Sequence, residues 1–280
     1  MENKEPIDKI GTWSEDKLEL LGKYLHEYTK IMKDQQDWCK NGYYYIDAFA
    51  GTGKPMAKDE ERYIDGSPAV ALKTKYSFKR YIFIEKEDWR VEKLKKLRVE
   101  FPNSDIKIIQ GDCNKIINEK ITTKIRYEYY NRGIIFLDPF GMQIEWNTIE
   151  NIAKTEALEI FLNFPIMAIN RSVLRNNPYN LNQLSIERMN KFWGSTDWKD
   201  DIYIETTDLF GNTITEKVPQ TAKSLGLLFQ KRLEQIFPKV TFPLVMKNSK
   251  GAPLYCLIFA GHNNTGKKIM EYIFNSFERL

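Results

Sequence analysis

The sequence predicts an α/β fold with a mostly parallel sheet of seven strands. Short apolar runs alternate with helical patterns between residues 43 and 165, which is the order of a parallel sheet with helical crossovers. These runs are apolar at successive positions, as in strands that are covered on both faces. The last two runs, within residues 240–263, are joined by an Asn-Ser-Lys-Gly turn, so we expect them to be antiparallel.

The expected elements follow one another in a regular order. An amphipathic helix is predicted at 14–38, with Ser14 as its N-cap, and a second helix at 67–76, with Ser67 as its cap. The first strand, 43–49, lies between them and ends in a glycine loop. The strands that follow are predicted at 80–87, 106–112, 133–140 and 158–165, and the helices at 88–101, 113–125, 146–155, 224–237 and 266–280.

This pattern divides the chain into four parts. Residues 1–42 form an N-terminal helical segment, and residues 43–168 form the Rossmann-like core. Residues 169–222 are rich in Asn, Trp and Tyr and break the rhythm of the sheet, so we interpret them as an inserted helical subdomain with a small hairpin at 202–218. Residues 223–280 complete the core with a helix, the antiparallel strand pair and a last helix.

Composition excludes several classes of protein. The net charge is 42 − 38 = +4 over 280 residues, which permits nucleic-acid binding without arguing for it. The three cysteines are far apart and form no CxxC pair, which indicates reduced thiols in the cytoplasm. Two histidines are too few for a His-ligated metal site, so we expect no metal. No apolar run is long enough to span a membrane.

The stretch YYYIDAFAGTGKP, residues 43–55, places a glycine loop directly after a strand. A P-loop needs Gly-x-x-x-x-Gly-Lys-Ser/Thr, but Ala48 stands at the first glycine and Pro55 at the hydroxyl residue. A dinucleotide fingerprint needs a third glycine where this chain has Met56. Neither of these two loops therefore fits the sequence.

The pattern that fits is Asp47-x-Phe49-x-Gly51-x-Gly53. It resembles motif I of the class I methyltransferases that depend on S-adenosylmethionine (SAM). Glycines let the backbone pass close to a ligand and adopt positive φ. A carboxylate at the strand end can hold the methionine ammonium, directly or through water. The alternative is a tight strand-to-helix turn that binds nothing.

Three further acids end the next three strands. Glu85 is placed to accept hydrogen bonds from both ribose hydroxyls, as in doubly wound nucleotide folds. It follows Asp47 by 85 − 47 = 38 residues, because the polar segment 54–66 lengthens the connection. Asp112, with Cys113 beside it, is expected near the adenine amine, and Asp138 ends the fourth strand. The alternative is that these acids are helix caps.

Asp138-Pro139-Phe140, within Leu-Asp-Pro-Phe-Gly, resembles motif IV of methyltransferases that act on exocyclic amines. There the acid and the proline carbonyl accept hydrogen bonds from the target NH₂, and the aromatic ring stacks on the base. This chain lacks the second proline of that motif, although the Asp-Pro-Phe-Gly form also occurs in tRNA guanine-N2 dimethyltransferases. Asn163 adds a polar group at the end of the next strand. The alternative is a rigid turn with a core Phe140.

Together these pieces resemble the three-Cys-motif partner (TcmP) family. The matching pieces are YYYIDAFAGTGK, DGSPAVAL, RYIFIEKE, IIQGDCN, FLDPFGMQIEW, LNFPIMAINR and LIFAGHNNTGKKIM. The resemblance implies a class I methyltransferase fold with SAM as cofactor, and a neighbouring three-cysteine protein, similar to radical-SAM enzymes, as a partner. It also implies that Asp47, Phe49, Gly51, Gly53, Glu85, Asp112 and Cys113 face the cofactor, and that Asp138, Pro139 and Phe140 face the acceptor.

The inserted segment is the expected substrate side. Arg171 and Arg175 are four residues apart and would share one face of a helix. With Lys191, Trp193 and Trp198 they combine cations with flat aromatic surface, which could hold phosphates and stack bases. The alternative is a small lid with an aromatic core and a solvated charged face.

The leading hypothesis is a cytoplasmic SAM-dependent methyltransferase that modifies an exocyclic amine of a nucleic-acid base. A SAM-binding subunit of the three-cysteine partner, without activity of its own, is the first alternative. A methyltransferase for a small molecule or a protein is the second.

Overall fold

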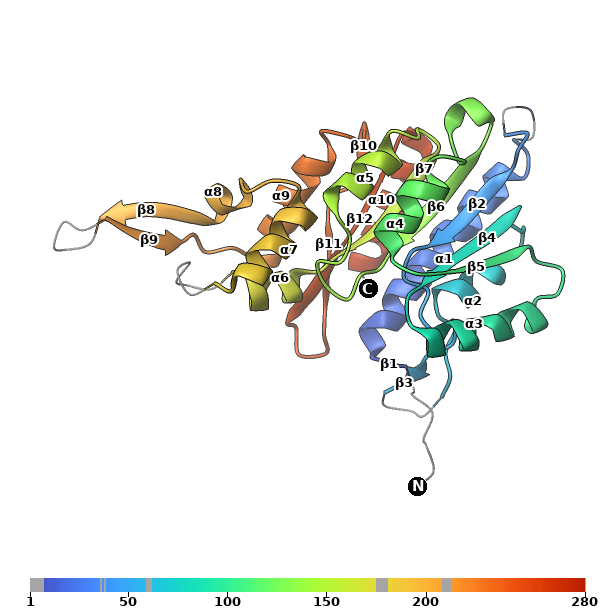
Figure 1. Ribbon diagram of the computed structural model, residues 1–280, viewed down its shortest axis with the longest axis horizontal. Helices are drawn as coiled ribbons and strands as arrows, with labels where there is room; N and C mark the ends of the chain where they lie inside the picture. The colour runs from blue at the N-terminus through green and yellow to red at the C-terminus, as the bar shows by residue number, and fades with distance from the viewer. Residues whose placement is uncertain are drawn as a thin grey trace, which may run out of the picture.

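The computed structural model describes residues 8–35, 37, 39–58, 62–174, 181–207 and 213–279. Within these residues the chain forms one large sheet of eight strands, in the order β10-β12-β7-β6-β2-β4-β5, with β11 also paired to β12 (Figure 1). The strands are β2 (Tyr43–Asp47), β4 (Arg80–Glu85), β5 (Ile106–Gln110), β6 (Arg132–Leu137), β7 (Leu158–Phe164), β10 (Lys239–Val240), β11 (Leu244–Lys247) and β12 (Pro253–Gly261).

The pairing confirms the predicted fold class. The strands β5, β4, β2, β6 and β7 are mutually parallel, and β12 runs antiparallel to β7. The expected count of seven strands is wrong by one, because β10 and β11 pair with successive parts of β12. Pro243, which lies between them, has no N–H to offer to a ladder.

Helices cover both faces of this sheet. One face carries α1 (Thr12–Met32), α2 (Ser67–Leu72), α3 (Asp88–Glu100) and α10 (Asn264–Glu278), which share a core with aromatic strand residues such as Phe83 and Phe136. The other face carries α4 (Cys113–Ile116), a π-helical continuation Ile117–Ile121, α5 (Trp146–Ala153) and α9 (Ala222–Leu233). Successive strand residues enter opposite cores, which explains the continuous apolar runs.

Two predicted helix caps are wrong. The first helix begins at Thr12 with Gly11 as its N-cap, and Ser14 lies inside the first turn. A Cβ at Gly11 would collide with the Trp13 ring, so a larger residue there would have to displace this ring. The helix α2 is capped by Gly66 rather than by Ser67. The Ser67 side chain instead hydrogen-bonds to Asp47.

The inserted segment is helical and carries a hairpin, as predicted. It includes the end of α6 (Ile166–Ser172), which begins before residue 169, together with α7 (Gln183–Trp193) and α8 (Trp198–Ile202), followed by the antiparallel pair β8 (Tyr203–Thr207) and β9 (Thr213–Lys217). Figure 1 shows this hairpin projecting from the body of the molecule. A short parallel pair, β1 (Lys9–Ile10) with β3 (Met56–Ala57), and a 3₁₀ turn, Tyr127–Tyr129, complete the described elements.

The insertion shares its core with the sheet. The ring of Phe229, on α9, stacks on Phe164 of β7 at 4.6 Å between centroids and on Phe192 of α7 at 5.2 Å. Aromatic pairs of this kind contribute about 0.5–1.5 kcal/mol beyond the burial of their area. One packed aromatic cluster therefore joins the C-terminal part, the insertion and the parallel sheet.

Replacing Phe229→Ala is expected to lower the free energy of unfolding by about 3–5 kcal/mol, because it opens a cavity in this shared cluster. Urea unfolding followed by tryptophan fluorescence should show one transition at a lower midpoint. The same change at the exposed Phe242 serves as control and should shift the midpoint little. Two separated transitions in the Phe229→Ala variant would contradict a common core.

Candidate functional site

The four predicted carboxylates lie at one edge of the sheet. Glu85 and Asp47 are the last residues of β4 and β2, Asp138 follows β6 directly, and Asp112 follows β5 by two residues. Because β5, β4, β2 and β6 are parallel neighbours, their carboxyl ends meet at the same edge. This is the edge at which open α/β sheets bind ligands.

The glycine loop after β2 is held against the end of β4. The Gly51 N–H donates to the Glu85 carboxylate at 2.9 Å, and Gly51 and Gly53 have φ values of +59° and +75°. A Cβ at Gly53 would lie 2.7 Å from the Leu97 side chain. Positive φ and close packing together require glycine at position 53.

Glu85 is a buried carboxylate that three backbone amides hold in place. Besides Gly51, the N–H groups of Lys86 and Glu87 donate to it at 2.7 and 2.9 Å. The guanidinium of Arg90 is 4.0 Å away. An ionised carboxylate has about four acceptor sites, so at least one remains for a ligand hydroxyl.

Asp47 lies beneath the loop rather than in front of it. It is fully buried, and it accepts hydrogen bonds from the Tyr45 hydroxyl at 3.1 Å and from the Phe49 N–H at 3.2 Å. Burial raises the pKa of this carboxyl from 3.8 to about 7, against the opposing effect of the Ser67 hydrogen bond. Asp47 lines neither cavity described below, so this arrangement lets it position the loop without reaching a ligand directly.

Two adjoining cavities open at this edge. The β4–β5 cavity has a volume of about 600 Å³ and is lined at the ends of these strands by Glu85, Gly111 and Asp112. The α1 cavity has a volume of about 350 Å³ and lies between the start of α1, the glycine loop and Asp138. Three residues line both cavities: Phe49, Phe140 and Ala168. A single elongated ligand could therefore occupy the two together.

An ion pair that the sequence did not reveal lies in the α1 cavity. The Lys17 ammonium contacts the Asp138 carboxylate at 2.5 Å, although the Lys17 side chain is only 7% exposed. The other oxygen of Asp138 accepts a hydrogen bond from the Asn163 amide at 2.6 Å. A signal was present, because Lys17 stands four residues before Leu21, on the face of α1 that is otherwise buried.

Two buried polar atoms in the α1 cavity have no hydrogen-bond partner among the described residues. They are the hydroxyl of Thr52 and the carbonyl oxygen of the Asn163 side chain. Both residues line the cavity and are less than 9% exposed. Unpaired buried polar groups are costly, and their presence at a cavity indicates a site for a polar ligand.

Phe140 is an exposed aromatic residue, which rules out the core Phe of the alternative interpretation. Its side chain is 71% exposed, and its backbone N–H donates to the Gln143 side chain at 2.9 Å. The guanidinium of Arg90 lies 5.2 Å from its ring centroid. Arg90 also pairs with Asp8 at 3.3 Å. An exposed ring between two cavities is suited to stack on a flat ligand group.

The helix-cap interpretation applies to one of the four acids. Asp112 caps α4 by accepting a hydrogen bond from the Lys115 N–H at 3.1 Å, while it also lines the β4–β5 cavity. Cys113 beside it is a buried free thiol whose pKa is raised by burial to about 12. Cys113 therefore acts as an apolar wall of the cavity rather than as a nucleophile.

The structure does not bring the predicted insertion residues to these cavities. Trp193 is 3% exposed and packs at 5.4 Å from the Phe229 ring, so the alternative of an aromatic-cored lid describes it. Arg171 is exposed on α6 and lines neither cavity. Arg175 lies outside the described residues. A different insertion cation, Arg188 of α7, does line the β4–β5 cavity.

Two kinds of feature are absent from the ranges of the chain that the structure describes. No group of three or more His, Cys, Asp or Glu side chains in these ranges could hold a metal ion. None of the helices described here has the length and apolar character needed to cross a bilayer.

No protein-family model matches the sequence, and no curated protein matches it. Among solved structures, Trm1 from Pyrococcus horikoshii, in complex with S-adenosyl-L-methionine, is 10% identical over 90% of this chain and 56% of that chain, with a TM-score of 0.46. A Legionella pneumophila protein is 15% identical over 87% of this chain and 97% of that chain, with a TM-score of 0.42. The N-terminal domain of EvdMO1 with SAH bound is 8% identical over 84% of this chain and 81% of that chain, with a TM-score of 0.39.

Likenesses of this strength carry no conclusion about the ligand or the reaction of this chain. The resemblance to the three-Cys-motif partner family stays a prediction, as do the roles assigned to the site residues and the boundaries of the four parts.

The raised pKa of Asp47 makes stability depend on pH in a defined direction. The pKa of Asp47 is higher in the folded protein than in the unfolded chain, so the folded state binds more protons between about pH 4 and pH 7. The free energy of unfolding therefore falls as the pH rises through this window. Between pH 5 and pH 8 the free energy of unfolding of the wild type should fall by on the order of 1–3 kcal/mol more than that of the Asp47→Asn variant.

Urea unfolding at both pH values measures this difference. The surface change Asp105→Asn is the control and should leave the pH dependence of the wild type intact. Equal pH dependence in the wild type and in Asp47→Asn would contradict a protonated Asp47.

Proposed function

We propose that this chain is a class I SAM-dependent methyltransferase. The observation that carries the proposal is the pair of adjoining cavities at the carboxyl edge of the sheet, with the Glu85-anchored glycine loop between them. In this proposal the β4–β5 cavity holds the adenosine, with Glu85 at the ribose and Asp112 at the adenine. The α1 cavity holds the methionine part, beside Gly51 and Gly53.

The residues present fit such a ligand in charge and in polarity. Glu85 keeps an acceptor for a ribose hydroxyl, and the unpaired Thr52 hydroxyl and Asn163 oxygen offer partners to a polar head group. Bound SAM would supply a methyl group on a sulfonium centre, which needs little acid or base help to react. The protein then has to orient the nucleophile and exclude water.

We propose an exocyclic amine of a nucleic-acid base as the acceptor. Asp138 and the carbonyl of Pro139 would accept hydrogen bonds from its NH₂ group, which aligns the nitrogen lone pair. The exposed ring of Phe140 supports this proposal, because it can stack on a base beside the acid. Arg90 and Arg188 would contribute positive charge at the rim of the β4–β5 cavity.

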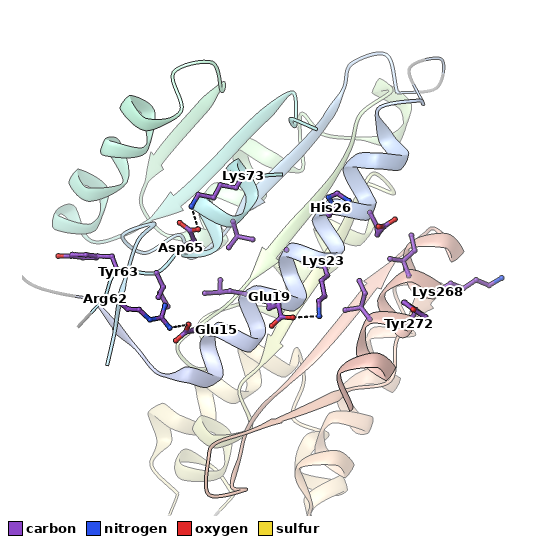
Figure 2. Close-up of a pocket in the computed structure, with 17 residues that line it drawn as sticks. Glu15, Glu19, Lys23, His26, Arg62, Tyr63, Asp65, Lys73, Lys268 and Tyr272 are labelled. Carbon is purple, nitrogen blue, oxygen red and sulfur yellow. Dashed lines mark hydrogen bonds and ion pairs between the residues drawn. The ribbon is translucent and has the colours of Figure 1, made fainter. Parts of the chain in front are cut away.

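A partner subunit is the second candidate, and a different cavity favours it. An open groove of about 1210 Å³ lies between α1, α2 and α10 (Figure 2). The apolar residues that line it include Leu18, Val70 and Ile273. Three ion pairs lie among the charged residues at its rim: Arg62 with Glu15 at 2.7 Å, Lys23 with Glu19 at 2.6 Å and Lys73 with Asp65 at 2.5 Å. Paired charges beside apolar residues suit a protein better than a nucleic acid. The three-cysteine partner implied by the TcmP resemblance is the proposed occupant.

The cofactor is tested first by calorimetric titration of SAM. The wild type is expected to bind with micromolar affinity, and Glu85→Gln about 10- to 100-fold more weakly, since the ribose loses a charged acceptor. Glu92→Gln, the same change on an exposed turn of α3, is the matched control. Absence of binding to the folded wild type would remove the stand-alone methyltransferase and leave the partner-dependent subunit.

The acceptor is tested through Phe140. If a base stacks on this ring, Phe140→Ala should weaken binding of a single-stranded oligonucleotide about 5- to 150-fold, the range of base–aromatic stacking. Fluorescence anisotropy at two salt concentrations measures the affinity, and Phe242→Ala is the control for loss of an exposed ring. Unchanged affinity with weak salt dependence would favour a small-molecule or protein acceptor.

A further inference from the structure

Lys17 is a buried cation that lines the α1 cavity. Among the described residues, the Asp138 carboxylate is its hydrogen-bond partner, and the Tyr255 ring lies 5.3 Å from its nitrogen. An ammonium carries three donors, so two donors remain for a ligand in the α1 cavity. Burying a charge costs several kcal/mol unless it is compensated. Such a lysine on an otherwise apolar helix face therefore indicates a functional role.

The α1 cavity presents both signs of charge close together. Lys17 supplies the positive charge and Asp138 the negative one, with 2.5 Å between their charged atoms. The unpaired Thr52 hydroxyl can donate, and the unpaired Asn163 oxygen can accept. An α-amino acid head group also carries both signs, on neighbouring atoms. The cavity is thus complementary to such a head group, with Lys17 for the carboxylate and the unpaired Asn163 oxygen for the ammonium, which leaves Asp138 to the acceptor.

The other charged groups that line this cavity are less suited to bind a carboxylate. Asp8 is already paired with Arg90 at 3.3 Å. Lys58 is exposed to solvent, and its ammonium lies 5.8 Å from the Trp13 ring centroid. A carboxylate contact is worth more in a buried site than in solvent, because screening is weaker there. Lys17 is therefore the cation that a buried carboxylate would meet.

We propose that Lys17 binds the carboxylate of the methionine moiety of SAM, and that this contact draws its ammonium away from Asp138. The inference rests on the proposed function, since it assigns a subsite within the same site. Before cofactor binding, Lys17 neutralises Asp138. After binding, the methionine carboxylate takes over Lys17, and the Asp138 oxygen becomes available to the acceptor amine. The order of binding is then cofactor first and acceptor second.

The test compares two ligands that differ only in this carboxylate. Calorimetry is carried out on the full chain with SAM and with decarboxylated SAM, for the wild type, Lys17→Met and Lys58→Met. The wild type and Lys58→Met should bind SAM about 10- to 100-fold more tightly than decarboxylated SAM, the range of a charged hydrogen bond. Lys17→Met should bind both ligands equally, with its affinity for decarboxylated SAM within a factor of two of the wild type.

Each other outcome overturns the inference in a recognisable way. Equal weakening of both ligands by Lys17→Met would assign Lys17 a purely structural role. If Lys17→Met still bound SAM more tightly than decarboxylated SAM, the methionine carboxylate would bind at another residue. Binding of neither ligand to the folded wild type would overturn the proposed function itself.

Because Lys17→Met leaves Asp138 without its cation, the double variant Lys17→Met/Asp138→Asn removes both charges. It should likewise bind SAM and decarboxylated SAM equally.

Discussion

The parallel pairing of β2 with both β4 and β6 is the constraint on which the whole site depends. Asp47 is in register with Phe83 of β4 and with Phe136 of β6. Glu85 and Asp138 each come two residues later, which places them roughly 6–7 Å further along the strand direction. This offset explains why Asp47 is buried under the loop while the other two carboxylates reach the cavities. A shift of one residue in either pairing would turn the acids to opposite faces of the sheet.

The N-terminal segment belongs to the site, although the sequence set it apart as residues 1–42. Asp8 pairs with Arg90 at 3.3 Å and Lys17 pairs with Asp138 at 2.5 Å, so two ion pairs attach this segment to the edge of the sheet. The Tyr255 hydroxyl adds a hydrogen bond to the Trp13 carbonyl at 2.6 Å. These contacts make the first turns of α1 a wall of the α1 cavity rather than an appendage.

The parts of the site that could be predicted from the sequence are those encoded locally. A glycine loop or an acid directly after an apolar run marks the end of a strand, and the alternation of runs and helices places those ends together. The Lys17–Asp138 pair joins residues 121 positions apart, so the local pattern could mark Lys17 as buried but could not identify its partner. Trp193 was misjudged for a related reason, because composition cannot tell an exposed aromatic ring from one packed against Phe229.

Two neighbouring acids of the site, Asp47 and Asp138, lie in different electrostatic surroundings. Burial raises the pKa of Asp47 to about 7, and the proximity of Asp138 raises it further. Asp138 is partly exposed and touches an ammonium, which compensates its charge directly. Asp138, the acid that borders the cavity, is therefore paired with a cation, while Asp47 supports the loop behind it through hydrogen bonds. The acceptor amine proposed above would meet Asp138 at the cavity wall, with the loop that Asp47 supports behind it.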